Sequence, residues 1–427
     1  MELKKKQVLC VESDDGVFDL AVIGGGLAGT MAAVSAAREG KRVILVEKYG
    51  CLGGMATAAL VYPFMRDYEG GSKKRVNAGL YERLLREVYL LGGSSAPDDR
   101  FYMEEIVKIV LDRLTREFGV KVLFHAKLCG VDFEEGSVRA VELATVSGRV
   151  TLRARYFIDA TGNADLVAQA GLPFEIGRDG DGLCQPMTLC FRFAGIDWNV
   201  LDKAQMNAEW KRLRAEGKLQ NPREDVLIVR SPIDGMAHIN ATRAVGVDPT
   251  DVEAVSEAEM RLREQMLELW HFFRNYVRGA ENCRIVGSAV ESGIRESRRI
   301  IGHVTVTAED LLSTRKFPDS VARGSYKLDI HSPTGTGTFL QSIPNNDYYT
   351  VPYRALIPRD TKNLFVAGRS VSATHEALSA IRIMPITTCM GEAIGIAAAL
   401  ALEAHCAPID VDVKVLREKL TAYGGLV

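Results

Sequence analysis

Two stretches late in the chain carry side chains suited to catalysis. The first, residues 291–299, places three arginines within five residues. The forked guanidinium group of arginine suits a carboxylate substrate or a developing negative charge. Arg295 is the preferred candidate, because Gly293 and Ile294 before it indicate a turn that presents its side chain. The alternative is an ion-paired surface segment, neutralised by the glutamates of the same stretch.

The second stretch, residues 368–385, contains His375, Glu376 and Arg382. A histidine has a near-neutral pKa and can act as a general acid or base. Glu376 is expected to orient this histidine or to bind substrate, and Arg382 to hold a substrate carboxylate or to stabilise reduced flavin. The alternative is a capped core histidine with a structural glutamate. Together with Arg295, these three side chains are the predicted catalytic residues.

The elements that must position these residues begin with a βαβ unit. A β-rich run over 18–23 is followed by Gly24, Gly26 and Gly29 in Gly-x-Gly-x-x-Gly spacing. Gly24 permits a tight turn, Gly26 lets the backbone approach a pyrophosphate, and Gly29 lets the next helix pack close to the strand.

An alanine-rich helix over 28–39 is predicted next, ended by Gly40. A second strand over 43–46 then delivers Glu47, eighteen residues after Gly29. A carboxylate there accepts hydrogen bonds from ribose hydroxyls, and the helix N-terminus faces a pyrophosphate. The sequence therefore predicts binding of an ADP-containing dinucleotide.

Three further segments carry a family resemblance. Residues 47–57 contain Glu-Lys and Gly-Gly-Met-Ala-Thr, residues 155–165 contain Ala-Thr-Gly, and residues 361–370 end in Ala-Gly-Arg-Ser. In this order they resemble the FAD-dependent oxidoreductases of the glutathione-reductase-2 type, which are related to the fumarate reductase flavoproteins. The resemblance is weakest over residues 180–355. It implies FAD as the cofactor, and NAD alone is the alternative.

The resemblance also implies which residues bind the cofactor. Lys127 and Leu128 are expected to face the adenine, and a helix opening at Pro385 points its positive end at the flavin. Many relatives have an aspartate that binds the ribityl chain where this chain has Arg369, so that contact does not carry over. The predicted cofactor-binding residues are Gly24, Gly26, Leu27, Ala28, Gly29, Glu47, Lys48, Gly53, Gly54, Met55, Ala56, Thr57, Lys127, Leu128, Ala160, Thr161, Gly162, Asp165, Gly368, Arg369, Ile386 and Thr387.

The expected fold class is α/β. It consists of a Rossmann-like FAD-binding domain, with a parallel sheet plus a β-meander, and an inserted α+β substrate domain. The longest predicted helix of the inserted domain covers residues 253–276, after a cap region at 248–251. The expected division is a polar leader (1–17), the first part of the FAD-binding domain (18–179), the substrate or cap domain (180–355) and the C-terminal part of the FAD-binding domain (356–427).

Composition is that of a soluble enzyme. The 427 residues have a net charge of −2, which gives no electrostatic reason to expect nucleic acid or an anionic membrane as partner. No apolar stretch is expected to reach the roughly 18 residues of a membrane span. The N-terminus lacks the apolar core of a secretory signal, so a cytoplasmic location is expected.

The eight cysteines are scattered and form no Cys-x-x-Cys pair, which argues against an iron–sulfur or zinc site, and no metal is expected. Cys51 also lacks the second cysteine that disulfide reductases of the resembled superfamily carry. Cys51 and Cys389 are expected near the cofactor, where either one is a candidate for a covalent flavin link.

The predicted function is that of an FAD-dependent oxidoreductase that moves a hydride between flavin N5 and a small organic substrate, including one that bears a carboxylate. The alternatives are a non-redox or sensing FAD-binding subunit of a larger assembly, or an NAD(P)-dependent dehydrogenase. No second Gly-x-Gly-x-x-Gly unit is present. A separate electron donor or acceptor, with NAD(P)H as a visiting partner, is therefore expected, and a homodimer is expected on general grounds.

Overall fold

The computed structural model describes residues 17–69, 72 and 74–427. Apart from Val17, the expected polar leader lies outside the described residues. The centre of the fold is a five-stranded sheet in the order β18-β7-β1-β2-β3, and all its neighbouring strands run parallel. This confirms the predicted Rossmann-like α/β class. The strands are β1 (Phe18–Ile23), β2 (Val43–Val46), β3 (Lys121–Leu123), β7 (Ala154–Asp159) and β18 (Leu364–Val366).

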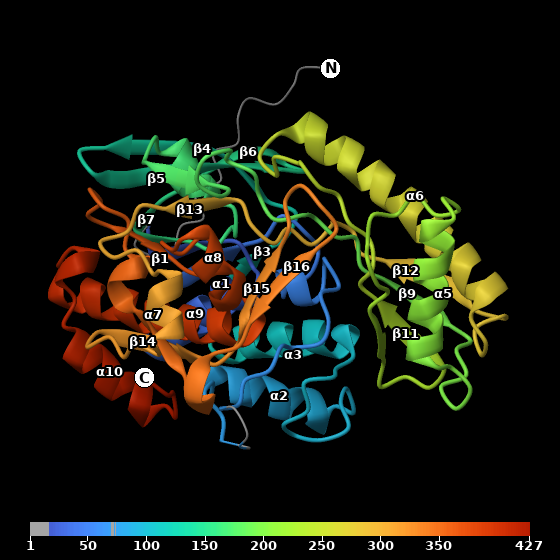
Figure 1. Ribbon diagram of the computed structural model, residues 1–427. Coiled ribbons are helices and arrows are strands. Elements are labelled where there is room, and N and C mark those ends of the chain that lie inside the picture. The colour runs from blue at the N-terminus through green and yellow to red at the C-terminus, as the bar shows by residue number, and fades with distance from the viewer. Residues whose placement is uncertain (1–16, 70–71, 73) are drawn as a thin grey trace.

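Two long helices lie side by side against this sheet, α1 (Leu27–Arg38) and α9 (Met384–Ala404) (Figure 1). Gly391 and Gly395 of α9 bring this helix close to α1. A Cβ added at Gly391 would lie 2.1 Å from the carbonyl oxygen of Ala28, and one at Gly395 would lie 2.1 Å from that of Ala32. The glycines therefore set the distance between the two helices.

By length and composition, α9 is the one described helix that could cross a membrane, which corrects the expectation that no segment reaches that length. Within the fold, 94 % of its most apolar 18-residue window is buried. Its apolar character is therefore that of a core helix.

The predicted β-meander is present as β4 (Lys127–Glu134), β5 (Ser137–Thr145) and β6 (Gly148–Leu152), all antiparallel. It packs over the parallel sheet through a shared apolar core that includes Val141, Leu143 and Phe157. The short strand before it, β3, belongs to the parallel sheet and not to the meander.

A second unit stands beside the first, on the right in Figure 1. Its four-stranded sheet has the order β10-β11-β9-β12, and α5 and α6 pack on it around Phe193, Trp210 and Phe272. Asp251 caps α6 as the cap region predicted, by accepting hydrogen bonds from two backbone N–H groups of the first turn. The elements are β9 (Phe191–Ala194), α5 (Lys203–Ala215), β10 (Ile228–Arg230), β11 (Met236–Ile239), α6 (Val252–Tyr276) and β12 (Arg284–Ser288).

The chain then returns to the first unit. Val321, Tyr349 and Val351 share the apolar core of α1 and α9. The exact domain boundaries given above stay predictions. The returning elements are β13 (Arg298–Ile300), which pairs with β8 (Phe174–Ile176), α7 (Ala308–Leu312), β14 (Ser320–Gly324), the hairpin of β15 (Leu328–His331) and β16 (Thr338–Gln341), β17 (Tyr349–Pro352) and α8 (His375–Ile381).

The remaining helices flank this core. They are α2 (Leu80–Leu90), α3 (Glu104–Glu117), α4 (Asp165–Gln169) and α10 (Val413–Ala422). The helix α2 begins directly after Gly79, which has a positive φ of 69°.

Candidate functional site

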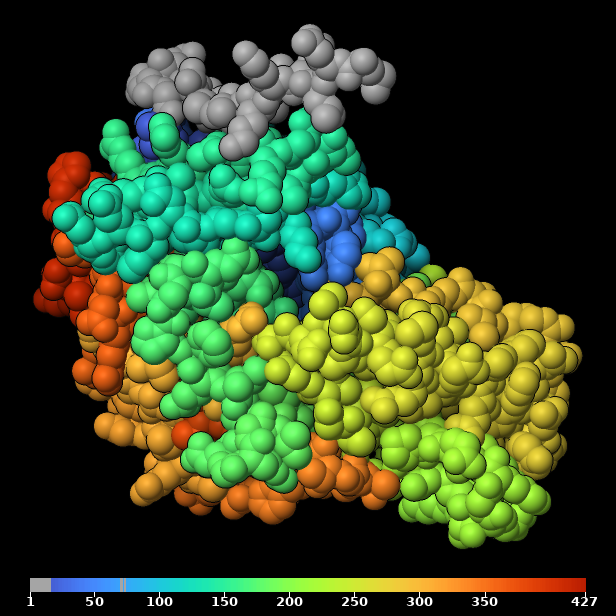
Figure 2. All heavy atoms as spheres, turned by 90° about the horizontal axis from the view of Figure 1, so that it is seen from above, coloured from blue at the N-terminus to red at the C-terminus, as the bar shows by residue number. Residues whose placement is uncertain are grey.

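One cavity of about 930 Å³ runs between the first unit, the second unit and the β15–β16 hairpin. Its walls come from the β1–α1 turn, the start of β4, the end of β7, the segment 291–298 and the start of α9. In Figure 2 the blue N-terminal segment is visible at the bottom of a hollow between the β4–β6 sheet and α6. Segments that are far apart in the sequence thus meet around one space.

The β1–α1 turn forms a cradle at one end of the cavity. Gly24 has a φ of 108°, and an added Cβ would lie 2.3 Å from the carbonyl oxygen of Ala160. No side chain caps the first turn of α1, so its backbone N–H groups are available to an anion. Gly26 and Gly54 face each other so closely that a Cβ on Gly54 would lie 2.9 Å from Cα of Gly26. The cradle therefore fits the pyrophosphate of a dinucleotide.

Glu47 is buried behind this turn. Its Oε2 accepts a hydrogen bond from the N–H of Gly25 at 2.7 Å, and its Oε1 accepts one from the N–H of Tyr49 at 2.8 Å. Burial raises the pKa of Glu47, against the two hydrogen bonds, which lower it. The carboxylate lines the cavity as predicted for a ribose-binding group, and it also fixes the turn.

Most of the predicted cofactor-binding residues line this cavity. They are Gly24, Gly26, Leu27, Ala28, Glu47, Lys48, Gly53, Gly54, Met55, Lys127, Leu128, Ala160, Thr161, Gly162, Asp165, Gly368, Arg369 and Thr387.

Four other predicted cofactor residues, Gly29, Ala56, Thr57 and Ile386, are not among the lining residues. Gly29 packs against the turn, because an added Cβ would lie 1.9 Å from the carbonyl oxygen of Gly24. The hydroxyl of Thr57 donates to the carbonyl oxygen of Leu52 at 2.6 Å. Ala56 and Ile386 belong to the main apolar core. These four support the cavity wall from behind.

Arg369 lies in the wall beside the end of β7. Its three guanidinium nitrogens donate to the carbonyl oxygens of Gly162 and Ile294 and to the side-chain oxygen of Asn163, at 2.6–2.9 Å. Burial lowers the pKa of Arg369 to about 10. Within the described part of the chain no carboxylate forms an ion pair with it, so it contributes positive charge to the cavity.

Arg295 and Arg382 line the other end of the cavity, and both were predicted. Nη1 of Arg295 donates to the carbonyl oxygen of Pro186 and to the hydroxyl of Thr188, both at 2.6 Å. Nη2 of Arg382 makes two long contacts of 3.4 Å, to the side-chain oxygen of Gln185 and to the carbonyl oxygen of Asp329. Burial, and then the charge of Arg382, lower the pKa of Arg295.

His375 and Glu376 are not among the residues that line the cavity. His375 is 5 % exposed, and its Nδ1 lies 2.7 Å from Oε2 of the fully buried Glu296. Glu376 is exposed on the first turn of α8, where Thr374 caps the helix. This placement matches the alternative of a capped core histidine, and the general acid–base role of His375 stays a prediction.

The arginine-rich stretch is divided by the fold. Arg299 pairs with Glu296 in a buried contact, and Arg298 pairs with Asp165 at 3.1 Å. Arg295 forms no ion pair within the described residues. Two of the three arginines are therefore ion-paired, but Arg299 is buried rather than on the surface, and Arg298 pairs with a residue outside the stretch. Arg295 and Arg298 both line the cavity, and Arg295, the predicted candidate, is the one without an ion pair among the described residues.

Neither cysteine proposed as a covalent anchor lines the cavity. Cys389 is held between the side chain of Asn77 and the carbonyl oxygen of Ala78, and Cys51 lies close to Thr57. Among the described residues no cluster of three or more His, Cys, Asp or Glu side chains has the arrangement of a metal site.

Sequence reasoning missed three polar residues at the start of the β15–β16 hairpin, Tyr326, Asp329 and His331, which all line the cavity. The Tyr326 hydroxyl donates to Oδ2 of Asp329 at 3.0 Å, and Nε2 of His331 lies 3.4 Å from Oδ1. The signal that was available is the spacing of Asp329 and His331, because residues i and i+2 of a strand point to the same side.

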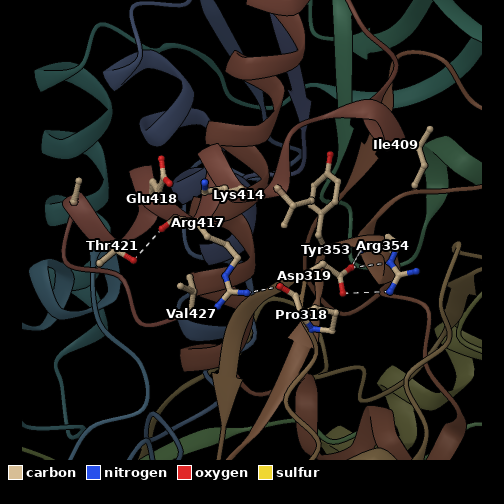
Figure 3. Close-up of a pocket in the computed structure, with 12 residues that line it drawn as sticks. Pro318, Asp319, Tyr353, Arg354, Ile409, Lys414, Arg417, Glu418, Thr421 and Val427 are labelled. Carbon is tan, nitrogen blue, oxygen red and sulfur yellow. Dashed lines mark hydrogen bonds and ion pairs between the residues drawn. The ribbon is translucent and has the colours of Figure 1, made fainter.

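A separate hollow of about 890 Å³ lies beside α10 and shares no lining residue with the large cavity. Figure 3 shows Arg354 paired with Asp319 at 2.9 Å, and Arg417 directed at the backbone of Pro318. Every guanidinium group of this hollow thus has a neighbouring oxygen as partner, and Lys414 adds a further cation to its lining.

The fold and this cavity define a flavoprotein of the Rossmann type. The family model for FAD dependent oxidoreductases matches residues 19–420, and the chain belongs to that family. It is therefore an FAD-dependent oxidoreductase, with FAD as its cofactor.

Individual relatives match less completely. Digeranylgeranylglycerophospholipid reductase 1 of Methanococcoides burtonii is 30 % identical over 165 residues, which are 34 % of this chain and 38 % of the relative. The mitochondrial dihydrolipoyl dehydrogenase of Schizosaccharomyces pombe is 27 % identical over 38 % of this chain and 32 % of its own length. The matches thus span about a third of these curated relatives. A solved geranylgeranyl bacteriochlorophyll reductase-like protein from Thermoplasma acidophilum is 14 % identical, with a TM-score of 0.47 over 96 % of this chain and 84 % of that one.

Proposed function

We propose that this FAD-dependent oxidoreductase moves a hydride between flavin N5 and a small organic substrate that carries a carboxylate, and that Arg295 and Arg382 bind the carboxylate. When bound, FAD supplies a two-electron acceptor or donor. The chain's own residues supply the binding site and its charge. The observation that carries the proposal is that Arg295 and Arg382 line the cavity, form no ion pair within the described residues and keep N–H groups without a hydrogen-bond partner.

The charges at this end of the cavity do not balance. Arg295 and Arg382 repel each other. Asp329 acts on both arginines, whereas Glu296, which also acts on Arg382, is already paired with Arg299. Arg223 and Arg243 are each paired, with Asp225 at 3.0 Å and with Glu224 at 3.7 Å.

A buried positive charge without a partner is costly, and a bound anion removes that cost. Nε and Nη2 of Arg295 and Nη1 of Arg382 have no hydrogen-bond partner within the described residues, and these atoms lie in side chains that line the cavity. Forked N–H donors of this kind match the geometry of a carboxylate.

Several wider assignments belong to the same proposal. We place the chain in the glutathione-reductase-2 type of flavoprotein, on the Gly-Gly, Ala-Thr-Gly and Ala-Gly segments that meet around the cavity. A separate electron donor or acceptor, NAD(P)H included, completes the turnover. A cytoplasmic location agrees with the seven unpaired cysteines among the described residues. A homodimer stays an expectation.

The first experiment is the absorption spectrum of the purified protein, followed by acid precipitation and identification of the released cofactor. The FAD-loaded protein is then mixed anaerobically with a panel of small carboxylic acids and their uncharged amides. We expect bleaching of the flavin by acids and not by the amides. FAD that no acid and no amide reduces would favour the non-redox subunit instead.

The second experiment removes one guanidinium group. Arg382→Gln should weaken binding of a carboxylic acid such as benzoate about tenfold or more, because a charge-assisted hydrogen bond contributes about 1.5–3 kcal/mol. Arg354→Gln, at the separate hollow, is the matched control and should leave binding unchanged. Equal affinity in the Arg382 variant and the wild type would contradict the carboxylate site.

A further inference from the structure

We infer that Tyr326 binds a hydroxyl group next to the substrate carboxylate, so that the site takes the anion of a hydroxy acid in preference to an amino acid or an unsubstituted acid. The inference rests on the proposed function, because it assumes that Arg295 and Arg382 hold the carboxylate. It adds a specificity residue, Tyr326, and a positioning residue, Asp329.

Tyr326 lies near the two arginines that are proposed to hold the carboxylate. Tyr326, Arg295 and Arg382 line the same end of the cavity, and the charges of both arginines act on the phenol. Burial and the charge of Asp329 raise the pKa of Tyr326, so the hydroxyl stays protonated. A neutral hydroxyl beside an anion site is suited to a second, uncharged polar group of the same ligand.

The hydrogen bond to Asp329 fixes which part of the Tyr326 hydroxyl faces the ligand. Its proton is directed at Oδ2 of Asp329, at 3.0 Å. The lone pairs of the phenol oxygen are therefore left to accept a hydrogen bond. A ligand hydroxyl has a proton to donate to this oxygen, whereas an unsubstituted acid has none.

His331 and Arg243 hold Asp329 in place. Nη2 of Arg243 lies 3.1 Å from Nδ1 of His331, and because arginine only donates, Nδ1 is the acceptor. The proton of the neutral ring is therefore on Nε2, directed at Oδ1 of Asp329 at 3.4 Å. Burial, and then the charge of Arg295, lower the pKa of His331 to about 3, so the ring is neutral at ordinary pH.

The same arrangement disfavours an amino acid. Burial alone would raise the pKa of Asp329, but the hydrogen bond from His331 and the charge of Arg382 lower it well below its usual value. Each of its oxygens already accepts one hydrogen bond, so an ammonium group would have to share these oxygens with Tyr326 and His331. A zwitterion also adds no net negative charge next to Arg295 and Arg382.

The test compares three acids of nearly equal size: mandelate, phenylacetate and phenylglycine. The two enantiomers of mandelate and of phenylglycine are measured separately. Leu227, Val252 and Leu340 line the cavity and are exposed, so an aromatic ring has apolar surface to contact. Dissociation constants are measured by calorimetry on the FAD-loaded protein. In the wild type we expect one enantiomer of mandelate to bind on the order of fivefold more tightly than phenylacetate, and phenylglycine to bind most weakly.

Tyr326→Phe should remove the advantage of mandelate while leaving phenylacetate binding within about twofold, which also shows that the variant is folded. Asp329→Asn should reduce the advantage by releasing the phenol. An advantage that persists in Tyr326→Phe, or phenylglycine as the tightest ligand, would overturn the inference. Equal binding of mandelate and phenylacetate would overturn the role of Tyr326 but not the carboxylate site. If none of the three acids binds, the carboxylate site itself is overturned.

Discussion

Replacing Glu47 by glutamine tests whether the cofactor cradle depends on one buried carboxylate. The two oxygens of Glu47 accept hydrogen bonds from the backbone N–H groups of Gly25 and Tyr49. In either orientation, a glutamine side chain directs its NH₂ group at one of these N–H donors. One hydrogen bond to a charged acceptor is lost, at a cost of about 1.5–3 kcal/mol, while glutamine avoids the cost of burying a charge.

The net loss expected from these opposing effects is about 2 kcal/mol, which corresponds to about 30-fold in an equilibrium constant. This loss should weaken FAD binding, because Gly25 belongs to the turn that positions the uncapped N-terminus of α1 for the pyrophosphate. The affinity is measured by titrating the apoprotein with FAD and following the quenching of flavin fluorescence. We expect the dissociation constant of the Glu47→Gln variant to rise about 30-fold.

Glu291→Gln is the matched control for this measurement. Glu291 also lines the cavity, but it pairs with the side chains of Lys48 at 2.7 Å and Tyr49 at 2.6 Å and has no contact with the turn. Its loss should change FAD affinity by at most about fivefold, because ion pairs with exposed partners contribute about 0–1 kcal/mol. Unchanged affinity in Glu47→Gln, or an equal loss in both variants, would refute the reasoning.

Two further predictions concern stability. Gly391→Ala should lower the melting temperature, because its Cβ would lie 2.1 Å from the carbonyl oxygen of Ala28 and would push α9 away from α1. The cost of about 1–3 kcal/mol outweighs the gain of about 1 kcal/mol in helix propensity. A variant as stable as the wild type would contradict this close packing. Burial and the charge of Arg192 lower the pKa of His238 to about 3. Below pH 6.5 the unfolded chain therefore binds a proton that the folded protein does not, and the free energy of unfolding decreases as the pH is lowered. At pH 5 the decrease is about 2 kcal/mol. The variant His238→Phe keeps the ring contact with Tyr62, so between pH 7.5 and pH 5 its free energy of unfolding, measured in urea, should decrease by about 2 kcal/mol less than that of the wild type. An equal decrease in both proteins would contradict this prediction.

The cofactor end of the site could be predicted from sequence because its signals are local. Gly24, Gly26 and Gly29 specify a turn within six residues, and the strand and helix around them are long enough to be identified. Glu47 follows from the same unit, since a parallel strand next to β1 must end at the same edge of the sheet. Each inference needed only neighbouring residues and one rule of chain geometry.

The substrate end could not be predicted in the same way, because its residues come from distant segments. Sequence proximity grouped His375 with Arg382, but α8 begins at His375 and ends before Arg382. The histidine packs inward on Glu296, whereas the arginine lies beyond the last turn and lines the cavity. Nothing near Arg382 in the sequence points to Tyr326 or Asp329, which the β15–β16 hairpin brings to it.

The three cavity arginines without ion pairs differ in what they can still bind. Each guanidinium nitrogen of Arg369 already donates to a protein oxygen, so this side chain acts on a bound group mainly through its charge. Arg295 donates through one nitrogen only, and Arg382 through one nitrogen over two long contacts. These two retain N–H groups for a ligand, and an anion bound between them would relieve the part of their mutual repulsion that Asp329 leaves. The proposed selectivity for a carboxylate therefore rests on the unused donors of Arg295 and Arg382.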